Sequence, residues 1–353
     1  MEINTAFQPM IDLSLKKNGD NATAAFATDV NYGLSQDQKS LPSRYFYDGK
    51  GSRLFQKIMD LPEYYLTRSE YEVLTENKET IIEEFAGEGF FHLIDLGAGD
   101  ALKTKILLQQ LADRHSAFNY IPVDISVDAM QQLSNSLHTG MPEISVQAIV
   151  GEYFQALEWL QANKTGRKVV LFLGSNIGNF KADESRDFLC SVRAYLQPGD
   201  KLLMGIDLHK DPDIILRAYD DAAGVTAAFN LNLLRRINRE LGGNFDLEQF
   251  RHYPLYNPQD GVMRSYLVSK KEQEVYIRDL RKSFHFAAWE AIHTENSHKY
   301  TLPQVKELGM ACGFTLQSVF QDNNHRFADV LFSVEEDDNR KPEGISDDRL
   351  IKD

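Results

Sequence analysis

Short apolar segments alternate with helix-like segments between about residues 72 and 207. The apolar segments are nearly continuous hydrophobic runs, as in parallel strands that are buried on both faces. The segments between them have the spacing of amphipathic helices. This alternation predicts a doubly wound α/β sheet. The expected strands are 90-FFHLIDL-96, 120-YIPVDI-125, 144-ISVQAIV-150, 168-KVVLFLG-174 and 201-KLLMGIDL-208, and the expected helices include 102–112, 127–137 and 182–196.

The end of the chain follows a different pattern. Residues 302–334 are predicted to form a helix, a strand, a turn and a second strand. Two strands joined by a short turn pair in an antiparallel manner. Such a finish distinguishes methyltransferase-type sheets from dehydrogenase-type sheets. The predicted fold class is therefore α/β, with a Rossmann-like class I methyltransferase sheet and an antiparallel C-terminal hairpin.

Two segments rich in aromatic residues and turns do not fit the alternation. We interpret them as one substrate-binding domain that is assembled from separated parts of the chain. The final residues are densely charged and are expected to be disordered. The predicted division is 72–208 with 301–334 for the methyltransferase domain, 25–71 with 209–300 for the substrate-binding domain, and 335–353 for the tail.

Composition limits the possible partners. The formal net charge of −14 opposes binding to phosphate backbones, so a small-molecule substrate is favoured over nucleic acid. No apolar run reaches the roughly 18 residues of a membrane span, and the first twenty residues lack the apolar region of a signal peptide. We therefore expect a cytoplasmic protein without membrane contact, and no obligate protein partner is indicated.

The cysteines predict neither a disulfide framework nor a zinc site. Cys190 and Cys312 are the only two, and they are far apart without the spacing of metal ligands. We expect no bound metal.

A glycine-rich turn follows the first expected strand, in 94-IDLGAGDALKT-104. Gly97 and Gly99 let the backbone approach a ligand closely, and the following helix can polarise that ligand with its N-terminus. The third glycine of a dinucleotide fingerprint is replaced by Leu102. The pocket suits either a nicotinamide dinucleotide or S-adenosylmethionine, and the missing glycine and the antiparallel hairpin favour S-adenosylmethionine.

Two acidic residues follow the next strands. Asp124 comes 25 residues after Gly99, where a carboxylate accepts hydrogen bonds from both ribose hydroxyls. Its structural alternative is a helix N-cap, a role that Ser126 can fill instead. Glu152 follows the third strand and is placed to meet the adenine amino group, with a solvated loop acid as the alternative of equal weight.

Five motifs of this chain are long or distinctive enough to compare with known families. They are 41-LPSRYFYDGKGSRLFQKIMDLPEYYLTRSE-70, LGAGDALKT, 171-LFLGSNIGNF-180, 216-LRAYDDAAGVTAAFN-230 and 294-TENS-297. Together they resemble the histidine N-alpha-methyltransferase family of ergothioneine biosynthesis. The resemblance spans about residues 35–334, and the family's relatives include fungal enzymes that methylate a tryptophan derivative. It therefore fixes the type of reaction better than the substrate.

The resemblance implies a set of site residues. Glu152 stands where the family usually has Asp, Asn176 where some members have Thr, and Ser265 where Met is found, so the shape of the pocket differs. The residues expected to bind S-adenosylmethionine are Gly97, Gly99, Lys103, Asp124, Glu152, Tyr153 and Gly174. Those expected to bind the amino acid are Phe55, Tyr64, Asn176, Asn179, Tyr219, Ser265, Glu295 and Ser297, with Tyr47 as the candidate catalytic residue.

The resemblance also implies roles for these side chains. Asn179 and Tyr219 would form hydrogen bonds to the substrate's α-carboxylate at one end of the pocket. Glu295 and Ser297 would form hydrogen bonds to its imidazole at the other end. Tyr47 orients the amine for direct displacement at the sulfonium methyl group, which needs no metal. Three transfers would give trimethylhistidine (hercynine).

Other interpretations stay open. Without the resemblance, the tyrosines are ordinary core or interface residues, and the pair at 295 and 297 is a solvated face. The same fold can also act on tryptophan or a histidine derivative, or bind the cofactor without turnover.

Overall fold

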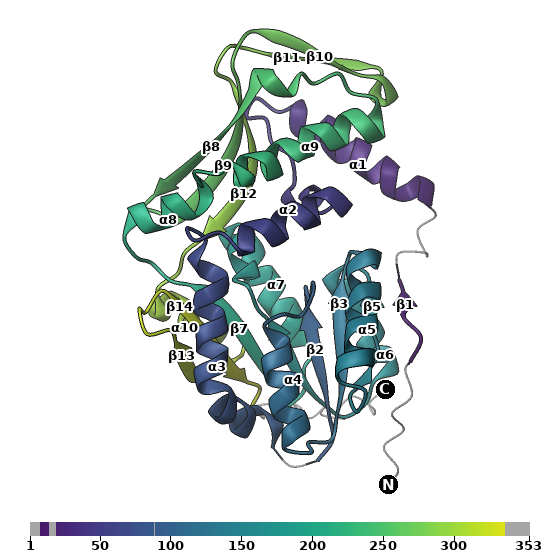
Figure 1. Ribbon diagram of the computed structural model, residues 1–353, viewed down its shortest axis with the longest axis vertical. Helices are drawn as coiled ribbons and strands as arrows, with labels where there is room; N and C mark the ends of the chain where they lie inside the picture. The colour runs from purple at the N-terminus through teal and green to yellow at the C-terminus, as the bar shows by residue number, and fades with distance from the viewer. Residues whose placement is uncertain (1–7, 14–18, 88, 336–353) are drawn as a thin grey trace, which may run out of the picture.

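The computed structural model describes residues 8–13, 19–87 and 89–335. Figure 1 shows two bodies stacked along the long axis. The lower body surrounds a large sheet, and the upper body surrounds a smaller, antiparallel one. The expected tail, 335–353, lies outside the described residues apart from its first member. No helix in the described ranges is both long and apolar enough to cross a bilayer.

The large sheet carries the expected alternation of strands and helices. Its strands are β1 (Ile11–Asp12), β2 (Phe91–Leu96), β3 (Phe118–Asp124), β4 (Ser145–Val146), β5 (Ile149–Val150), β6 (Arg167–Phe172), β7 (Lys201–Asp207), β13 (Thr315–Gln321) and β14 (Phe327–Ser333). Their order is β1-β5-β3-β2-β6-β7-β14-β13, with β4 beside β3. All pairs are parallel except those of β14, which is antiparallel to β7 and β13. The predicted fold class is confirmed.

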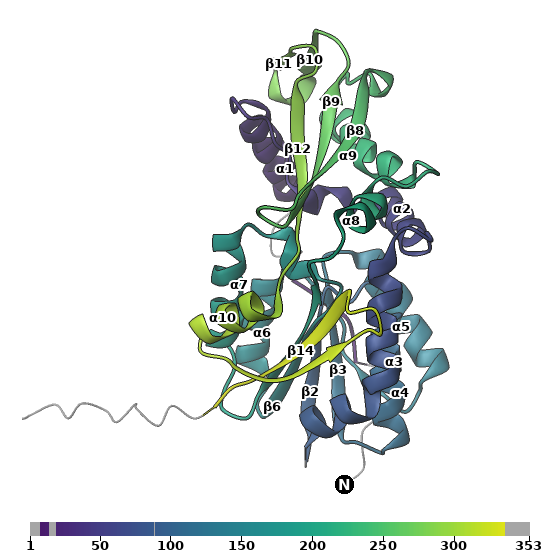
Figure 2. The same ribbon diagram turned by 90° about the vertical axis from the view of Figure 1, so that its left-hand side faces the viewer.

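Helices cover both faces of this sheet (Figure 2). One face packs its apolar side chains against α3 (Tyr65–Ala86), α4 (Thr104–Asp113) and α5 (Val127–Gly140). The opposite face packs against α6 (Tyr153–Asn163), α7 (Ala182–Ala194) and α10 (Leu302–Ala311). Burial on both faces explains why the central strands are continuous apolar runs. The carboxyl ends of the parallel strands point toward the upper body (Figure 1).

Two details differ from the expected elements. The strand expected at 144–150 is split into β4 and β5, although the Gln147 amide still donates to the Tyr120 carbonyl at 2.9 Å. The expected domain boundary between residues 71 and 72 falls inside α3, which packs on α4 and β14. One continuous helix therefore carries the chain from the upper body onto the sheet.

The upper body combines chain segments that are far apart in sequence. Helix α2 (Gly49–Met59) packs on α9 (Val225–Leu241), and Figure 1 shows these purple and green segments side by side. Phe46 from the first segment and Leu234 and Ile292 from the second share one apolar core. The other elements are α1 (Gly19–Leu34), α8 (Pro212–Tyr219), the sheet of β12 (Ala291–His298), β9 (Val262–Ser269) and β8 (Phe250–Asn257), the hairpin of β10 (Gln273–Ile277) and β11 (Lys282–Phe286), and the 3-10 turns η2 (Ser43–Phe46), η4 (Leu247–Gln249) and η5 (Arg278–Leu280).

A disulfide joins Cys190 to Cys312, with the two Cα atoms 4.6 Å apart. The expectation of no disulfide is wrong. The two residues are 122 positions apart in the chain, but α7 and the end of α10 pack together on one face of the sheet. Separation in sequence therefore hid the contact.

Candidate active site

A cavity lies between the two bodies, above the carboxyl end of β6. The lower body contributes the loop that follows β6, and the upper body contributes aromatic residues and the end of β12. Ligands of open α/β sheets bind at this edge. The lining residues are Tyr47, Phe55, Ile58, Tyr64, Leu66, Gly174, Ser175, Asn176, Asn179, Ala218, Tyr219, Thr226, Phe229, Glu295 and Ser297.

The glycine-rich turn after β2 is built for close approach. Gly97 has a φ of 80°, and a Cβ at this position would lie 2.9 Å from the Tyr153 hydroxyl oxygen. The Asp124 carboxylate, at the end of β3, accepts from the amides of Gly99 at 3.1 Å and Ser126 at 2.9 Å. These bonds hold the carboxylate beside the turn and leave lone pairs for a ligand. Burial raises the pKa of Asp124.

The structure separates the cofactor and capping interpretations of the two acids. The Ser126 hydroxyl accepts from the Ala129 amide at 3.2 Å, so Ser126 caps α5 and Asp124 is not needed for that role. Glu152 is exposed and lies at the N-cap of α6, where its amide donates to the Gln155 side chain at 3.3 Å. Glu152 therefore lies at the edge of the sheet where the cofactor is expected, but it also occupies the N-cap position of α6.

Lys103 forms an ion pair with Glu70, a buried acid that was not predicted as a site residue from the sequence. Glu70 lies on α3 and also accepts from the Gly174 amide at 2.6 Å. Asp329 lies close by on β14, and in the described part of the chain its carboxylate oxygens have no hydrogen-bond partner. Burial and the charge of Glu70 hold the pKa of Asp329 well above its usual range. These contacts connect Lys103, which follows the glycine-rich turn, to Gly174 in the loop after β6.

Gly205 of β7 makes room for this network, and its replacement by alanine is expected to destabilise the protein. The new Cβ would overlap the Glu70 carboxylate and lie 3.1 Å from the Gly174 amide nitrogen. Overpacking of this kind costs about 1–3 kcal/mol. Denaturant unfolding measures the change. The matched control is Gly140→Ala at the end of α5, where a Cβ meets nothing within 4 Å; equal stability of the two variants would contradict the packing.

The loop after β6 presents two free amides. Ser175 has a φ of 56°, and its hydroxyl accepts from the Asp207 amide at 2.9 Å, which fixes the start of the turn η3 (Asn176–Asn179). Across the described residues, the side-chain amides of Asn176 and Asn179 make no hydrogen bond to protein, although both residues line the cavity. Both are available to a polar ligand.

Aromatic rings form a continuous wall on the upper side of the cavity. Tyr47 packs edge-on against Phe55 at 5.6 Å between ring centroids, and Phe55 contacts Phe229 at 5.9 Å. Tyr64 bridges Phe55 and Tyr219, with centroids 6.3 Å from each. Burial and the charge of Glu295 hold the pKa of Tyr47 well above its usual range, so its hydroxyl stays protonated.

Glu295 is the acid of this cavity. Burial raises the pKa of its carboxyl to about 7, and the positive charge of Lys299 opposes that rise. Within the described residues, no protein donor forms a hydrogen bond to the carboxylate. Ser265, its register partner on β9, is buried and does not line the cavity, which corrects its expected place in the lining.

The raised pKa of Glu295 makes the stability of the ligand-free protein depend on pH. The folded state holds this proton more tightly than the unfolded chain between pH 4.5 and about 7, so stability falls as pH rises through that window. Glu295→Gln removes this loss of stability, because a glutamine amide does not ionise. The variant is expected to exceed the wild type by about 3 kcal/mol in denaturant unfolding at about pH 8, and by under about 1 kcal/mol at about pH 5. An equal difference at both pH values would contradict the assignment.

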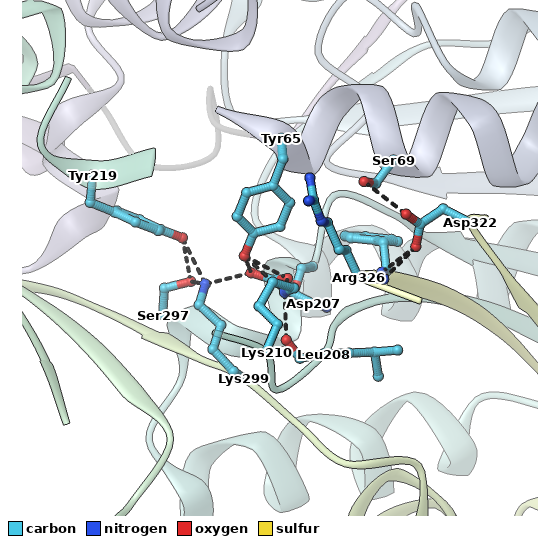
Figure 3. Close-up of polar contacts among 12 residues, drawn as sticks. Tyr65, Ser69, Asp207, Leu208, Lys210, Tyr219, Ser297, Lys299, Asp322 and Arg326 are labelled. Atoms are coloured by element: carbon cyan, nitrogen blue, oxygen red, sulfur yellow. Dashed lines mark hydrogen bonds and ion pairs between the residues drawn. The ribbon is translucent and has the colours of Figure 1, made fainter. Parts of the chain in front are cut away.

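Tyr219 and Ser297 belong to one buried network (Figure 3). The Tyr219 hydroxyl donates to Ser297 Oγ at 2.8 Å, and Lys299 Nζ contacts both oxygens. Lys299 also pairs with Asp207 at 2.7 Å, and Lys210 binds the same carboxylate. The expected separation of Tyr219 and Ser297 into opposite ends of the pocket is therefore wrong, because their side chains touch.

Comparison with known proteins identifies the family. The sequence profile described as "Histidine-specific methyltransferase, SAM-dependent" matches residues 26–334. The chain belongs to this family. Among its relatives, a histidine N-alpha-methyltransferase of Mycolicibacterium smegmatis is 40% identical over 80% of this chain and 86% of that protein. Ergothioneine biosynthesis protein 1 of Neurospora crassa is 32% identical over 64% of this chain and 27% of that protein. An L-tryptophan methyltransferase of Psilocybe serbica is 25% identical over 90% and 95%.

In this histidine-specific methyltransferase, the residues expected to bind substrate and cofactor lie on two sides of one site. The expected residues that line the cavity are Tyr47, Phe55, Tyr64, Gly174, Asn176, Asn179, Tyr219, Glu295 and Ser297. The others expected at the cofactor, apart from Gly174, are Gly97, Gly99, Lys103, Asp124, Glu152 and Tyr153, at or near the carboxyl edge of the sheet.

Other residues of the site escaped the sequence analysis of this methyltransferase. Phe229 and Thr226 line the cavity from α9, and the buried Thr226 hydroxyl has no partner in the described part of the chain. Glu70, Asp207 and Lys299 act behind the lining. Only Asp207 had a usable signal, since it is a carboxylate at the end of a predicted strand.

Proposed function

We propose that the chain transfers three methyl groups from S-adenosylmethionine to the α-amine of L-histidine, giving trimethylhistidine (hercynine) for ergothioneine biosynthesis. Family membership and the names of the relatives support the histidine and the cofactor. One observation carries the proposal. The Glu295 carboxyl and the Ser297 hydroxyl line the same cavity as the loop at the carboxyl end of β6. This arrangement can pair both nitrogens of an imidazole.

The residues around the glycine-rich turn fit S-adenosylmethionine. Asp124 is held beside the turn with lone pairs free for ribose hydroxyls, and Gly97 leaves space for close approach. Lys103 places a positive charge beside Gly174, where the carboxylate of the methionine portion would bind. When bound, the cofactor supplies a methyl group that its sulfonium already activates, so the protein has only to align and deprotonate the amine.

Neutral groups hold the substrate carboxylate in this proposal. Asn179 and Tyr219 donate hydrogen bonds to it, and neither adds a formal charge beside the methyl donor. An arginine would bind the carboxylate more strongly, but its positive charge would repel the nearby sulfonium. Because Tyr219 touches Ser297, histidine binds in a compact conformation, with its carboxylate and one ring nitrogen close together.

The amine faces the aromatic wall. Tyr47 has a raised pKa, so it orients the amine as a neutral hydroxyl instead of serving as a phenolate base. No acid of the cavity other than Glu295 is available to hold the amine in a salt bridge among the described lining residues. The amine can therefore release its proton to solvent and attack with its lone pair. Phe55, Tyr64 and Phe229 can retain the methylated ammonium by cation–π contact.

A time course tests the number of transfers. With excess cofactor, mass spectrometry is expected to show trimethylhistidine as the end product, and purified dimethylhistidine is expected to serve as a substrate. Dimethylhistidine still has a lone pair and can rotate about its Cα–N bond to present it. Accumulation of monomethylhistidine, with dimethylhistidine refused, would contradict trimethylation.

A larger amino acid is the second candidate substrate. Ser265 pairs with Glu295 in the register of β9 and β12, and its short side chain leaves more room beside Glu295 than a methionine would. The likeness to a tryptophan methyltransferase favours an indole for such space. Competition between histidine and tryptophan decides between the two.

A cytoplasmic location and the absence of an obligate partner stay predictions from the sequence.

A further inference from the structure

Lys299 lies directly behind the cavity wall and is fully buried. Its ammonium donates to the Tyr219 hydroxyl at 2.9 Å, to Ser297 Oγ at 2.8 Å and to the Asp207 carboxylate at 2.7 Å. A lysine has three donors and no acceptor, so all its protons are used. Lys299 is not among the residues that line the cavity, but its ammonium contacts both hydroxyls and so limits what they can do there (Figure 3).

The Tyr219–Ser297 pair has one proton left over. Ser297 Oγ accepts from Tyr219 at 2.8 Å and from Lys299 at 2.8 Å, so both of its lone pairs are occupied. Only the Ser297 proton remains free, and Ser297 lines the cavity. Reversing the bond between the hydroxyls would free the Tyr219 proton instead. With substrate bound, each hydroxyl can instead keep its acceptor bond from Lys299 and turn its own proton outward, Tyr219 to the substrate carboxylate and Ser297 to the ring.

We propose that Lys299 is a positioning residue that makes the Tyr219–Ser297 pair a hydrogen-bond donor to the unprotonated ring nitrogen of the substrate. This inference rests on the proposed function, since it takes histidine as the substrate. Glu295 accepts from the ring N–H, and the hydroxyl pair donates to the other ring nitrogen. The two groups together match neutral imidazole, which has one donor and one acceptor. Imidazolium has two donors and an indole has no acceptor, so both are mismatched.

Lys210 provides a matched control for the charge of Lys299. It is also a buried cation that binds Asp207, and it contacts the Tyr65 hydroxyl at 2.9 Å. It makes no contact with Tyr219 or Ser297 among its contacts in the described chain. Both lysines therefore support the same carboxylate, but only Lys299 touches the hydroxyl pair. A purely structural role would be shared by the two, whereas the proposed role belongs to Lys299.

Two substrate analogues isolate the ring-nitrogen contact. In 3-(4-thiazolyl)-L-alanine, sulfur replaces the distal N–H of histidine and the proximal nitrogen remains as an acceptor. In 3-(3-thienyl)-L-alanine, a C–H group replaces that nitrogen as well. Wild type is expected to bind the thiazolyl compound about tenfold more tightly, the size of one hydrogen bond. Titration calorimetry with S-adenosylhomocysteine present gives the two dissociation constants.

The lysine variants then decide the inference. Lys299→Gln is expected to reduce the ratio to about one, because its amide can still donate to Asp207 while its carbonyl takes up the free hydroxyl proton. Lys299→Met, the second variant, adds no acceptor for that proton but frees lone pairs on both hydroxyls, so it is expected to lower the ratio by a smaller factor. Lys210→Met is expected to keep the wild-type ratio. An unchanged ratio in a folded Lys299 variant, or a wild-type ratio near one, overturns the inference. Failure of wild type to methylate histidine would overturn the proposed function instead.

Discussion

Replacing Glu295 with alanine is expected to lower kcat/KM for histidine by about 10- to 150-fold, the cost of one hydrogen bond to a charged group. It is also expected to narrow the preference for histidine over tryptophan. The carboxylate has no protein hydrogen bond within the described residues, so an indole or phenyl ring would leave it buried and unpaired. Alanine removes both the imidazole partner and that penalty.

Competition assays with both amino acids measure the preference. The control is Glu290→Ala, which removes an acid just before β12 that pairs with Lys39 and does not line the cavity. Its preference ratio is expected to equal that of the wild type. An unchanged ratio in Glu295→Ala would show that Glu295 does not face the substrate ring.

Asn179→Ala and Tyr219→Phe are each expected to raise the KM for histidine while leaving cofactor affinity nearly unchanged. Each loses one hydrogen bond to the substrate carboxylate, at a cost of about 1.5–3 kcal/mol. Both side chains line the cavity, whereas the glycine-rich turn and Asp124, which are the residues proposed to bind the cofactor, do not. Tyr219→Phe also removes a contact of Lys299, so its stability needs a separate measurement.

Steady-state kinetics with histidine and calorimetry with S-adenosylhomocysteine separate the two affinities. Tyr276→Phe, on the exposed hairpin of the upper body, is the control and is expected to change neither. Loss of cofactor binding with histidine affinity retained would refute the assignment of Asn179 or Tyr219 to the carboxylate.

The sheet was predictable because its signals are local. Strands such as β2 and β6 are buried on both faces, so each is an apolar run in the sequence. The glycine-rich turn and Asp124 follow such runs directly, and the sheet places them at one edge. β4 and β5 each pair with β3 over only two residues, and the strand expected there is interrupted between them.

The support behind the site was not predictable in the same way. Glu70 becomes a site residue only because α3 brings it under Gly174, and Lys299 only because β12 ends beside Asp207. Each of these two contacts joins residues that are about a hundred positions apart. Sequence motifs identified most of the residues that line the cavity. The direct contact of Tyr219 with Ser297, however, depends on how α8 packs against the sheet that β8 and β9 form with β12.

The measurement that tests the central claim most directly is mass spectrometry of purified protein with S-adenosylmethionine and each of the twenty amino acids in turn. Histidine is expected to gain the mass of three methyl groups, with fragmentation placing all three on the α-nitrogen, and the other amino acids are expected to react far more slowly. Cofactor binding without any methylated histidine, or methyl groups on the imidazole ring, would contradict the claim.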